Sequence, residues 1–216
     1  MNRGTAPAVL YSLMRIGLVD PNAQVALFPC DHYVSNNDLF MQHVRIAFEA
    51  LVDRQDLIVL LGITPDAPET EHRWIEPGSS FRGGSEMLFH VRRFIEKPSV
   101  EIARRMWTEG RCLWNSFVLI ARLWNLLALM IRGMPELCDT FAHSGWTLGT
   151  TFESDAVQQI YQSIVPKGFY GSVLTSHMRD HLSVLPVSGV YWNDLGDPSR
   201  VAATMAHLGP TPRWMP

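Results

Sequence analysis

Two aspartates far apart in the sequence each follow an apolar run that is expected to form a strand. Asp31 comes after residues 25–28, and Asp194 comes after residues 190–192 and just before a glycine turn. Parallel strands present ligand sites at their carboxyl ends, and Mg²⁺ usually takes one or two protein carboxylates, with phosphates and waters completing its octahedron. The pattern indicates a magnesium site. The alternative is that Asp31 caps a helix or starts a turn, and that Asp194 and Asp197 are ordinary turn residues.

An acid and a base stand side by side at the end of another apolar run, in the segment Phe94-Ile95-Glu96-Lys97-Pro98. Side chains alternate across a strand, so Glu96 and Lys97 can turn into one site only where the strand is ending, which is where the proline places them. There the lysine would hold a phosphate as a compact point charge, and the glutamate would accept hydrogen bonds from sugar hydroxyls. The alternative is an exposed, charged strand end without a ligand.

Two further pairs have spacings that occur in catalytic or metal sites. Cys30 and His32 lack the third, orienting group that a cysteine nucleophile needs. His177 and His181 have the H-x-x-x-H spacing of metal ligands on a helix, but the glutamate of H-E-x-x-H is missing and no third ligand is evident. We therefore expect neither a cysteine nucleophile nor a histidine metal site.

The composition is that of a globular chain with enough apolar residues for a core. Of 216 residues, 47% are apolar and 18% are charged, and the formal net charge is −3. No basic run is long enough to grip a nucleic-acid backbone, so nucleic acid is not an expected partner. Three cysteines without C-x-x-C spacing fit reduced thiols, so we expect a cytoplasmic protein. The apolar stretch 113–131 contains Asn115, Arg122 and Asn125, each costly in a bilayer, so no membrane partner is expected.

Alternating helical and buried-strand patterns predict an α/β fold. Helical spacing over residues 6–18, an apolar run at 25–28, helical spacing over 38–51 and a second apolar run at 57–63 are typical of a parallel sheet covered by helices on both faces. With no internal repeat or low-complexity linker, residues 1–216 are expected to form one domain. The other expected elements are strands near 74–76, 88–95, 112–116, 182–187 and 190–192, and helices at 100–109, at 118–131 and after residue 135.

Six short segments, spread over almost the whole chain, form a more specific pattern than any one of them. They are Arg3-Gly4-Thr5-Ala6-Pro7-Ala8, Phe28-Pro29-Cys30-Asp31-His32, Leu61-Gly62-Ile63-Thr64-Pro65, Phe94-Ile95-Glu96-Lys97-Pro98, Trp114-Asn115-Ser116 and Trp192-Asn193-Asp194-Leu195-Gly196. In this order they resemble the sugar-phosphate nucleotidyltransferases, most of all the mannose-1-phosphate guanylyltransferases. The resemblance implies a three-layer α/β sandwich with a mostly parallel, Rossmann-like sheet. It also implies a reaction in which mannose 1-phosphate attacks the α-phosphate of GTP, giving GDP-mannose and pyrophosphate.

The resemblance also implies a role for individual residues. By motif match, Asp31 and Asp194 would hold the Mg²⁺ ion, and with Lys97 they would form the catalytic set. Lys97 would contact the sugar phosphate, while Glu96 and Asn115 would hold sugar hydroxyls. Such a reaction needs in-line positioning and neutralisation of phosphate charge more than it needs a covalent nucleophile.

The nucleotide end of the site is expected to be incomplete. By the same resemblance, Thr5 would lie near the nucleotide base. Family members begin with a strand and a glycine-rich loop of the G-G-x-G-T-R type, which wraps the triphosphate with backbone amides. Met1 corresponds to a point well inside that domain, so we expect the first strand and this loop to be missing, through the loss of ~80 residues or fewer. A central strand lost in this way would leave unpaired edges that favour association with another copy, so a homo-oligomer is left open.

Two positions near the sugar depart from the family pattern. Arg73 stands in the run that aligns with a glycine-rich Gly-Tyr-Gly-Tyr-Ile-like stretch, and Phe117 stands where many members have glycine. An arginine puts a long side chain where backbone normally approaches the ligand. The alternative function is therefore a catalytically impaired, truncated homologue that binds only sugar phosphate or a full-length relative.

Overall fold

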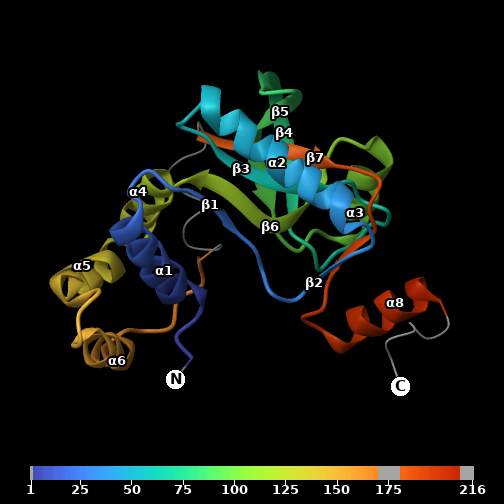
Figure 1. Cartoon of the computed structure of the whole chain (residues 1–216). Helices are drawn as coiled ribbons and strands as arrows, with labels where there is room; N and C mark the ends of the chain where they lie inside the picture. The colour runs from blue at the N-terminus through green and yellow to red at the C-terminus, as the bar shows by residue number, and fades with distance from the viewer. Residues whose placement is uncertain (1, 170–180, 210–216) are drawn as a thin grey trace.

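The computed structural model describes residues 2–169 and 181–209, which form a mixed six-stranded sheet with helices on both faces (Figure 1). The strands lie in the order β1-β6-β3-β7-β5-β4, β4 also pairs with β6, and a separate two-stranded ribbon joins β2 to β8. The strands are β1 Gln24–Leu27, β2 His32–Val34, β3 Ile58–Ile63, β4 Trp74–Gly83, β5 Glu86–Ile95, β6 Leu113–Arg122, β7 Leu182–Val187 and β8 Trp192–Asp194.

The α/β fold is confirmed, but the expectation of a mostly parallel sheet is wrong. Among the described strands, only β3 and β7 pair in parallel. β6 pairs antiparallel with both β1 and β3, so β1 and β3 run in the same direction without being neighbours. The helical crossover predicted between these two strands therefore exists. The parallel pairing does not, because a strand from later in the chain lies between them.

Strand β3 shows why both faces of the sheet are covered. All six of its residues are buried, and successive side chains point to opposite faces. Ile58 and Leu60 join a core with α1, α4, α5 and α6, whereas Val59 and Leu61 join a second core with α2 and α3. The expected three layers are thus present. The helices are α1 Thr5–Val19, α2 Asn37–Asp53, α3 Val100–Glu109, α4 Leu123–Gly133, α5 Pro135–His143, α6 Glu153–Ser163 and α8 Pro198–Leu208, with a short 3-10 turn at Gly145–Thr147.

The apolar stretch 113–131 differs from the expected division into a strand that ends at Ser116 and a helix from Val118. β6 continues to Arg122, and α4 begins at Leu123. Residues 119–121 lie between β1 and β3 and pair with both, a long-range contact that local apolar spacing does not reveal. Among the residues that the structure describes, no helix is both long and apolar enough to cross a membrane.

The directions of β1, β3 and β7 determine where the ribbon of β2 and β8 forms. These three strands run the same way, so β1 and β7 have their carboxyl ends at one edge of the sheet. The chain continues from β1 into β2 and from β7 into β8, and the two extensions pair antiparallel. β8 lies two residues later than the strand expected at 190–192, so Asp194 is its last residue. The helix α8 then follows β8 at the right of Figure 1.

Candidate active site

The ribbon brings the two predicted metal ligands together. His32 pairs with Asp194 across it, and the backbone N–H of Leu195 donates to the carbonyl oxygen of Asp31 at 2.6 Å. Asp31 Oδ2 and Asp194 Oδ1 lie 3.4 Å and 3.3 Å from the point where a Cβ on Gly196 would stand. The two carboxylates therefore face one small space beside Gly196, and a side chain at that position would crowd both.

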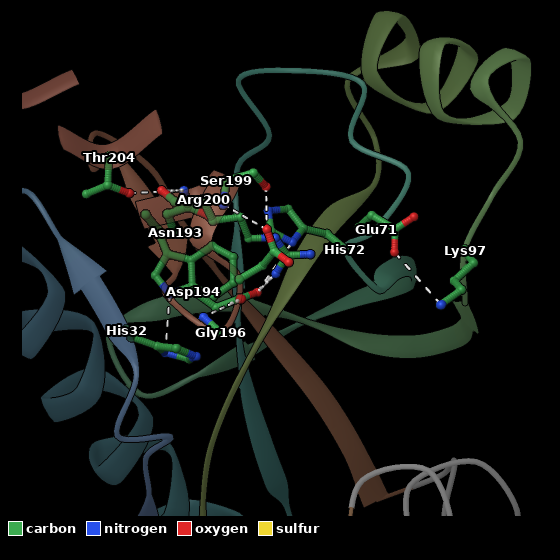
Figure 2. A network of polar contacts seen from close by, with 12 residues as sticks. His32, Glu71, His72, Lys97, Asn193, Asp194, Gly196, Ser199, Arg200 and Thr204 are labelled. Carbon is green, nitrogen blue, oxygen red and sulfur yellow. Dashed lines mark hydrogen bonds and ion pairs between the residues drawn. The ribbon is translucent and has the colours of Figure 1, made fainter. Parts of the chain in front are cut away.

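Asp194 is already engaged by two side chains (Figure 2). Arg200, in the first turn of α8, donates from Nη1 to Asp194 Oδ2, and His72 Nδ1 lies 3.7 Å from the same oxygen. His72 is buried, and its ring packs against Trp114 and Trp192 with centroids 4.7 Å and 5.3 Å away. The guanidinium of Arg200 and the buried imidazole of His72 thus lie against the carboxylate of Asp194, which the sequence pattern predicted only to precede a glycine turn.

Burial of His72 predicts a pH-dependent stability. Burial, and secondarily the charge of Arg200, lowers the pKa of His72 from 6.5 to about 4, against the opposing effect of Asp194. Below pH 6.5 the unfolded chain takes up a proton at this histidine that the folded chain does not, so the free energy of unfolding falls as the pH drops towards 4. Between pH 6.5 and 5 we expect His72 to account for a loss of about 2 kcal/mol.

Urea unfolding at both pH values, for the wild type and for His72→Gln, measures this loss. His72→Gln should show a smaller decrease in stability between the two pH values. His143→Gln, a substitution on the exposed side of α5, is the matched control and should keep the wild-type decrease. Parallel pH profiles for all three proteins would contradict the prediction.

The segment 71–73 connects the aspartates to the residues predicted to bind the sugar phosphate. Glu71 Oε2 lies 3.9 Å from Lys97 Nζ, and Arg73 Nη2 lies 2.7 Å from Glu96 Oε1. The residue between them is the buried histidine described above. Three consecutive side chains therefore each contact a different part of the candidate site.

Lys97 lies apart from the aspartates. Its side chain is 80% exposed, and Figure 2 shows it extending towards Glu71 and not towards Asp194. Its backbone has φ +42°, a left-handed conformation that non-glycine residues seldom adopt and that is often found at functional sites. The structure thus brings Asp31 and Asp194 together, but it does not bring the ammonium group of Lys97 into contact with them.

The two positions that depart from the family pattern contact each other beside Glu96 and Asn115. The guanidinium carbon of Arg73 lies 5.5 Å from the centroid of the Phe117 ring. The backbone oxygen of Arg73 accepts a hydrogen bond from Asn115 N at 2.8 Å. Phe117 has φ +58°, which glycine adopts without strain. Asn115 is buried; its Oδ1 accepts from Phe117 N at 2.8 Å, while its Nδ2 has no hydrogen-bond partner among the described residues. The predicted sugar-binding glutamate is thus paired with an arginine, and the predicted sugar-binding asparagine retains a free donor.

Thr5 lies away from this cluster. It is the first residue of α1, and its Oγ1 accepts from the backbone N–H of Phe169 at 2.9 Å. In Figure 1, α1 and α8 stand at opposite sides of the molecule. The predicted contact of Thr5 with a nucleotide base stays a prediction.

A hollow of about 320 Å³ adjoins the aspartate cluster. His72 and Arg200 both line it, together with Trp114 and Trp192, two residues that are otherwise buried. Aromatic residues and hydrogen-bond acceptors in one lining are suited to a ligand that presents both apolar C–H groups and hydroxyls, as a sugar ring does. Its acidic lining residues are Asp66, Glu69 and Glu71.

Comparison with known proteins shows the family of this chain. A sequence model described as nucleotidyl transferase matches residues 1–209, nearly the whole chain. The chain belongs to the nucleotidyl transferase family.

The nucleotidyl transferase chain is similar to several curated proteins. It is 27% identical over 139 residues to a mannose-1-phosphate guanylyltransferase from Klebsiella pneumoniae, which covers 64% of this chain and 29% of the relative. It is 25% identical over 209 residues to the alginate biosynthesis protein AlgA from Pseudomonas aeruginosa, covering 92% of this chain and 40% of the relative. The chain thus spans less than half the length of these two relatives.

Solved structures share the fold of this nucleotidyl transferase. A mannose-1-phosphate geranyltransferase from Thermus thermophilus superposes with a TM-score of 0.73 at 23% identity, covering 91% of this chain and 53% of that chain. A mannose-6-phosphate isomerase from Helicobacter pylori gives a TM-score of 0.67 at 17% identity, covering 90% and 72%. At these identities the likeness supports the fold alone.

The donor set of the nucleotidyl transferase fits a magnesium ion. Asp31 and Asp194 offer hard oxygen ligands that face one space, and Mg²⁺ needs only one or two carboxylates when phosphates and waters supply the rest. Over residues 2–169 and 181–209, no group of three or more His, Cys, Asp or Glu side chains converges on a metal position. His177, of the pair with His181, lies outside these described residues. The site therefore does not have the closed set of protein ligands that a structural zinc ion requires.

Sequence reasoning missed two members of this cluster, His72 and Arg200. His72 lies within the run that departs from the family pattern, so no motif identified it. Arg200 follows Asp194 by six residues, and Asp197 with Pro198 predicts the start of a helix between them. A basic residue is unfavourable in the first turn of a helix, where acidic residues are preferred. Arg200 at that position therefore indicated that a carboxylate lies nearby as its partner.

Proposed function

We propose that this chain forms the metal and sugar-phosphate part of a mannose-1-phosphate guanylyltransferase site. In the reaction, a phosphate oxygen of mannose 1-phosphate attacks the α-phosphorus of GTP, the bond to the β-phosphate oxygen breaks, and pyrophosphate leaves as GDP-mannose forms. The observation that supports it most directly is the meeting of Asp31 and Asp194 beside Gly196, within a family-matched chain. The substrates are inferred from relatives that are longer than this chain.

Asp31 and Asp194 would hold the magnesium ion, which would neutralise charge on the reacting phosphates. The absence of a side chain at Gly196 supports this role, because the backbone there leaves both carboxylates accessible to one ion. Phosphoryl transfer depends mainly on positioning and on charge neutralisation, which is what two converging carboxylates and a metal ion can supply. The protein would not need a covalent nucleophile.

Lys97, Glu96 and Asn115 would bind the sugar phosphate. The pair between Lys97 and Glu71 is long and exposed, so a phosphate could displace the glutamate at little cost. The unpaired Nδ2 of Asn115 would gain a partner from a sugar hydroxyl once the groups that bury it move aside, since a buried donor without a partner is costly. Glu96 would accept hydroxyl hydrogen bonds once it is released from Arg73.

The test is to supply the protein with GTP, mannose 1-phosphate and Mg²⁺ and to measure GDP-mannose and pyrophosphate. Turnover by this chain would give both products in equal amounts, and neither when Mg²⁺ is removed by chelation. Replacing GTP with other nucleoside triphosphates, and mannose 1-phosphate with glucose 1-phosphate, defines the substrates. Failure to bind mannose 1-phosphate, measured by calorimetry in the same buffer, would contradict the proposal.

A second candidate is a binding protein of the same family that takes up sugar phosphate without turnover. The observation that favours it is that two carboxylates of the candidate site, the metal ligand Asp194 and the sugar-binding Glu96, are each paired with an arginine of this chain. It predicts saturable binding of mannose 1-phosphate with no release of pyrophosphate. The calorimetric and product measurements together distinguish the two functions.

A further inference from the structure

We propose that the guanidinium of Arg200 acts as the counter-ion of Asp31 and Asp194 when no metal ion is bound. A divalent metal ion must displace this guanidinium before it binds to the two aspartates. The inference rests on the proposed function only in taking these two aspartates as the metal ligands. It assigns to Arg200 a role in positioning and regulation of the site.

The contact between Arg200 and Asp194 occupies Oδ2 of that carboxylate, next to the Oδ1 atom that faces Asp31 in the shared space. Arg200 Nη1 donates to Asp194 Oδ2, and the other oxygen of that carboxylate accepts a long hydrogen bond of 3.3 Å from Gly196 N. The two charged side chains are only 23% and 18% exposed, so this is not a loose surface pair. A guanidinium on Oδ2 and a metal ion on the same carboxylate would repel each other at close range.

The backbone of Arg200 is held firmly beside Asp194. Asn193, the residue before the aspartate, donates from Nδ2 to the carbonyl oxygen of Arg200 at 3.2 Å and to Thr204 Oγ1 at 3.0 Å. Asp197 caps α8 by accepting from Ser199 N at 2.8 Å. Because α8 is fixed to β8 in this way, metal entry would require only the side chain of Arg200 to rotate away.

The negative charge of the two aspartates is larger than the positive charge that Arg200 supplies. Asp31 and Asp194 carry two negative charges at the shared space, against one on the guanidinium. The neighbouring ring nitrogens belong to His72 and His32, and three acidic residues line the adjoining hollow. A divalent ion therefore matches the carboxylate pair better than one guanidinium does, but it would share the Asp194 carboxylate with the guanidinium of Arg200 unless that ion pair is broken.

The experiment is a titration with Mn²⁺, observed by electron paramagnetic resonance without nucleotide or sugar phosphate. We expect Arg200→Gln to bind Mn²⁺ at least ten-fold more tightly than the wild type, and Arg200→Lys, which keeps the charge, to stay within about three-fold of it. The matched control is Arg132→Gln, which removes one exposed charge from the last turn of α4 and should change the affinity less than two-fold. The double variant with Asp194→Asn and Arg200→Gln should lose the gain.

Equal or weaker binding by folded Arg200→Gln, no Mn²⁺ binding by either protein, or a gain that persists in the double variant would each overturn the inference. A measurement on the wild type covers the case in which Arg200→Gln does not fold. The side-chain Nε–H signal of Arg200 in NMR spectra should exchange faster with water at saturating Mg²⁺, and an unchanged signal would overturn the inference. Because no substrate is present, these results are separate from any failure to form GDP-mannose.

Discussion

Asp194→Asn is expected to lower GDP-mannose formation by about 100-fold or more while leaving the chain folded. The amide removes one of two negative charges that face the space beside Gly196, so the site would hold a magnesium ion poorly. In Mn²⁺ titrations without substrate, the same change should weaken binding at least ten-fold. Steady-state rates at saturating Mg²⁺, with circular dichroism to check the fold, measure the effect.

The control for Asp194→Asn is Asp53→Asn, which makes the same chemical change at an exposed position at the end of α2. The chain enters α2 from β2, and the last residue of this 17-residue helix lies about 25 Å from its first. It should retain the wild-type rate. An unchanged rate for folded Asp194→Asn would remove this aspartate from the metal site.

Trp74→Ala is expected to reduce the free energy of unfolding by about 3 to 5 kcal/mol. Trp74 is fully buried in the core beneath α2 and α3, and its ring meets that of Trp114 at a centroid distance of 6.0 Å. Its Nε1 also donates to the backbone oxygen of Glu69 at 2.8 Å, which fixes the loop that carries acidic residues of the hollow. Truncation leaves a cavity and an unpaired carbonyl group.

Urea unfolding at neutral pH, followed by far-ultraviolet circular dichroism, measures this loss. Trp124→Ala on α4 is the matched control, because that side chain is 47% exposed and its removal should cost less than about 1 kcal/mol. Similar losses for the two variants would show that Trp74 is not a major part of the core. A change in the slope with urea would indicate an altered unfolded state.

The sequence predicted the elements whose signals are local. The helix at 100–109 and the strand at 182–187 have the bounds that the sequence pattern predicted. The order of strands could not be predicted in this way, because the position of β6 between β1 and β3 depends on contacts between residues about 50 to 100 positions apart. For the same reason, the strand within 113–131 was predicted to end too early.

The candidate site shows the same division. Strand ends and motif order predicted Asp31 and Asp194, and the ribbon of β2 and β8 places them together. The partners of these residues could not be predicted, because Arg200 and His72 reach Asp194 through tertiary packing. The pairing of Glu96 with Arg73 has the same origin, and it changes which groups a substrate must displace.

The contacts of residues 71–73 restrict how the loop before β4 can vary in length. Its outer residues, Glu71 and Arg73, reach the end of β5 through Lys97 and Glu96, whereas the residue between them turns towards Asp194. Adding or deleting one residue just ahead of Trp74 would exchange these directions, as a one-residue slip does in a strand. Changes of residue type are compatible with this geometry, but insertions and deletions would disrupt both halves of the site at once.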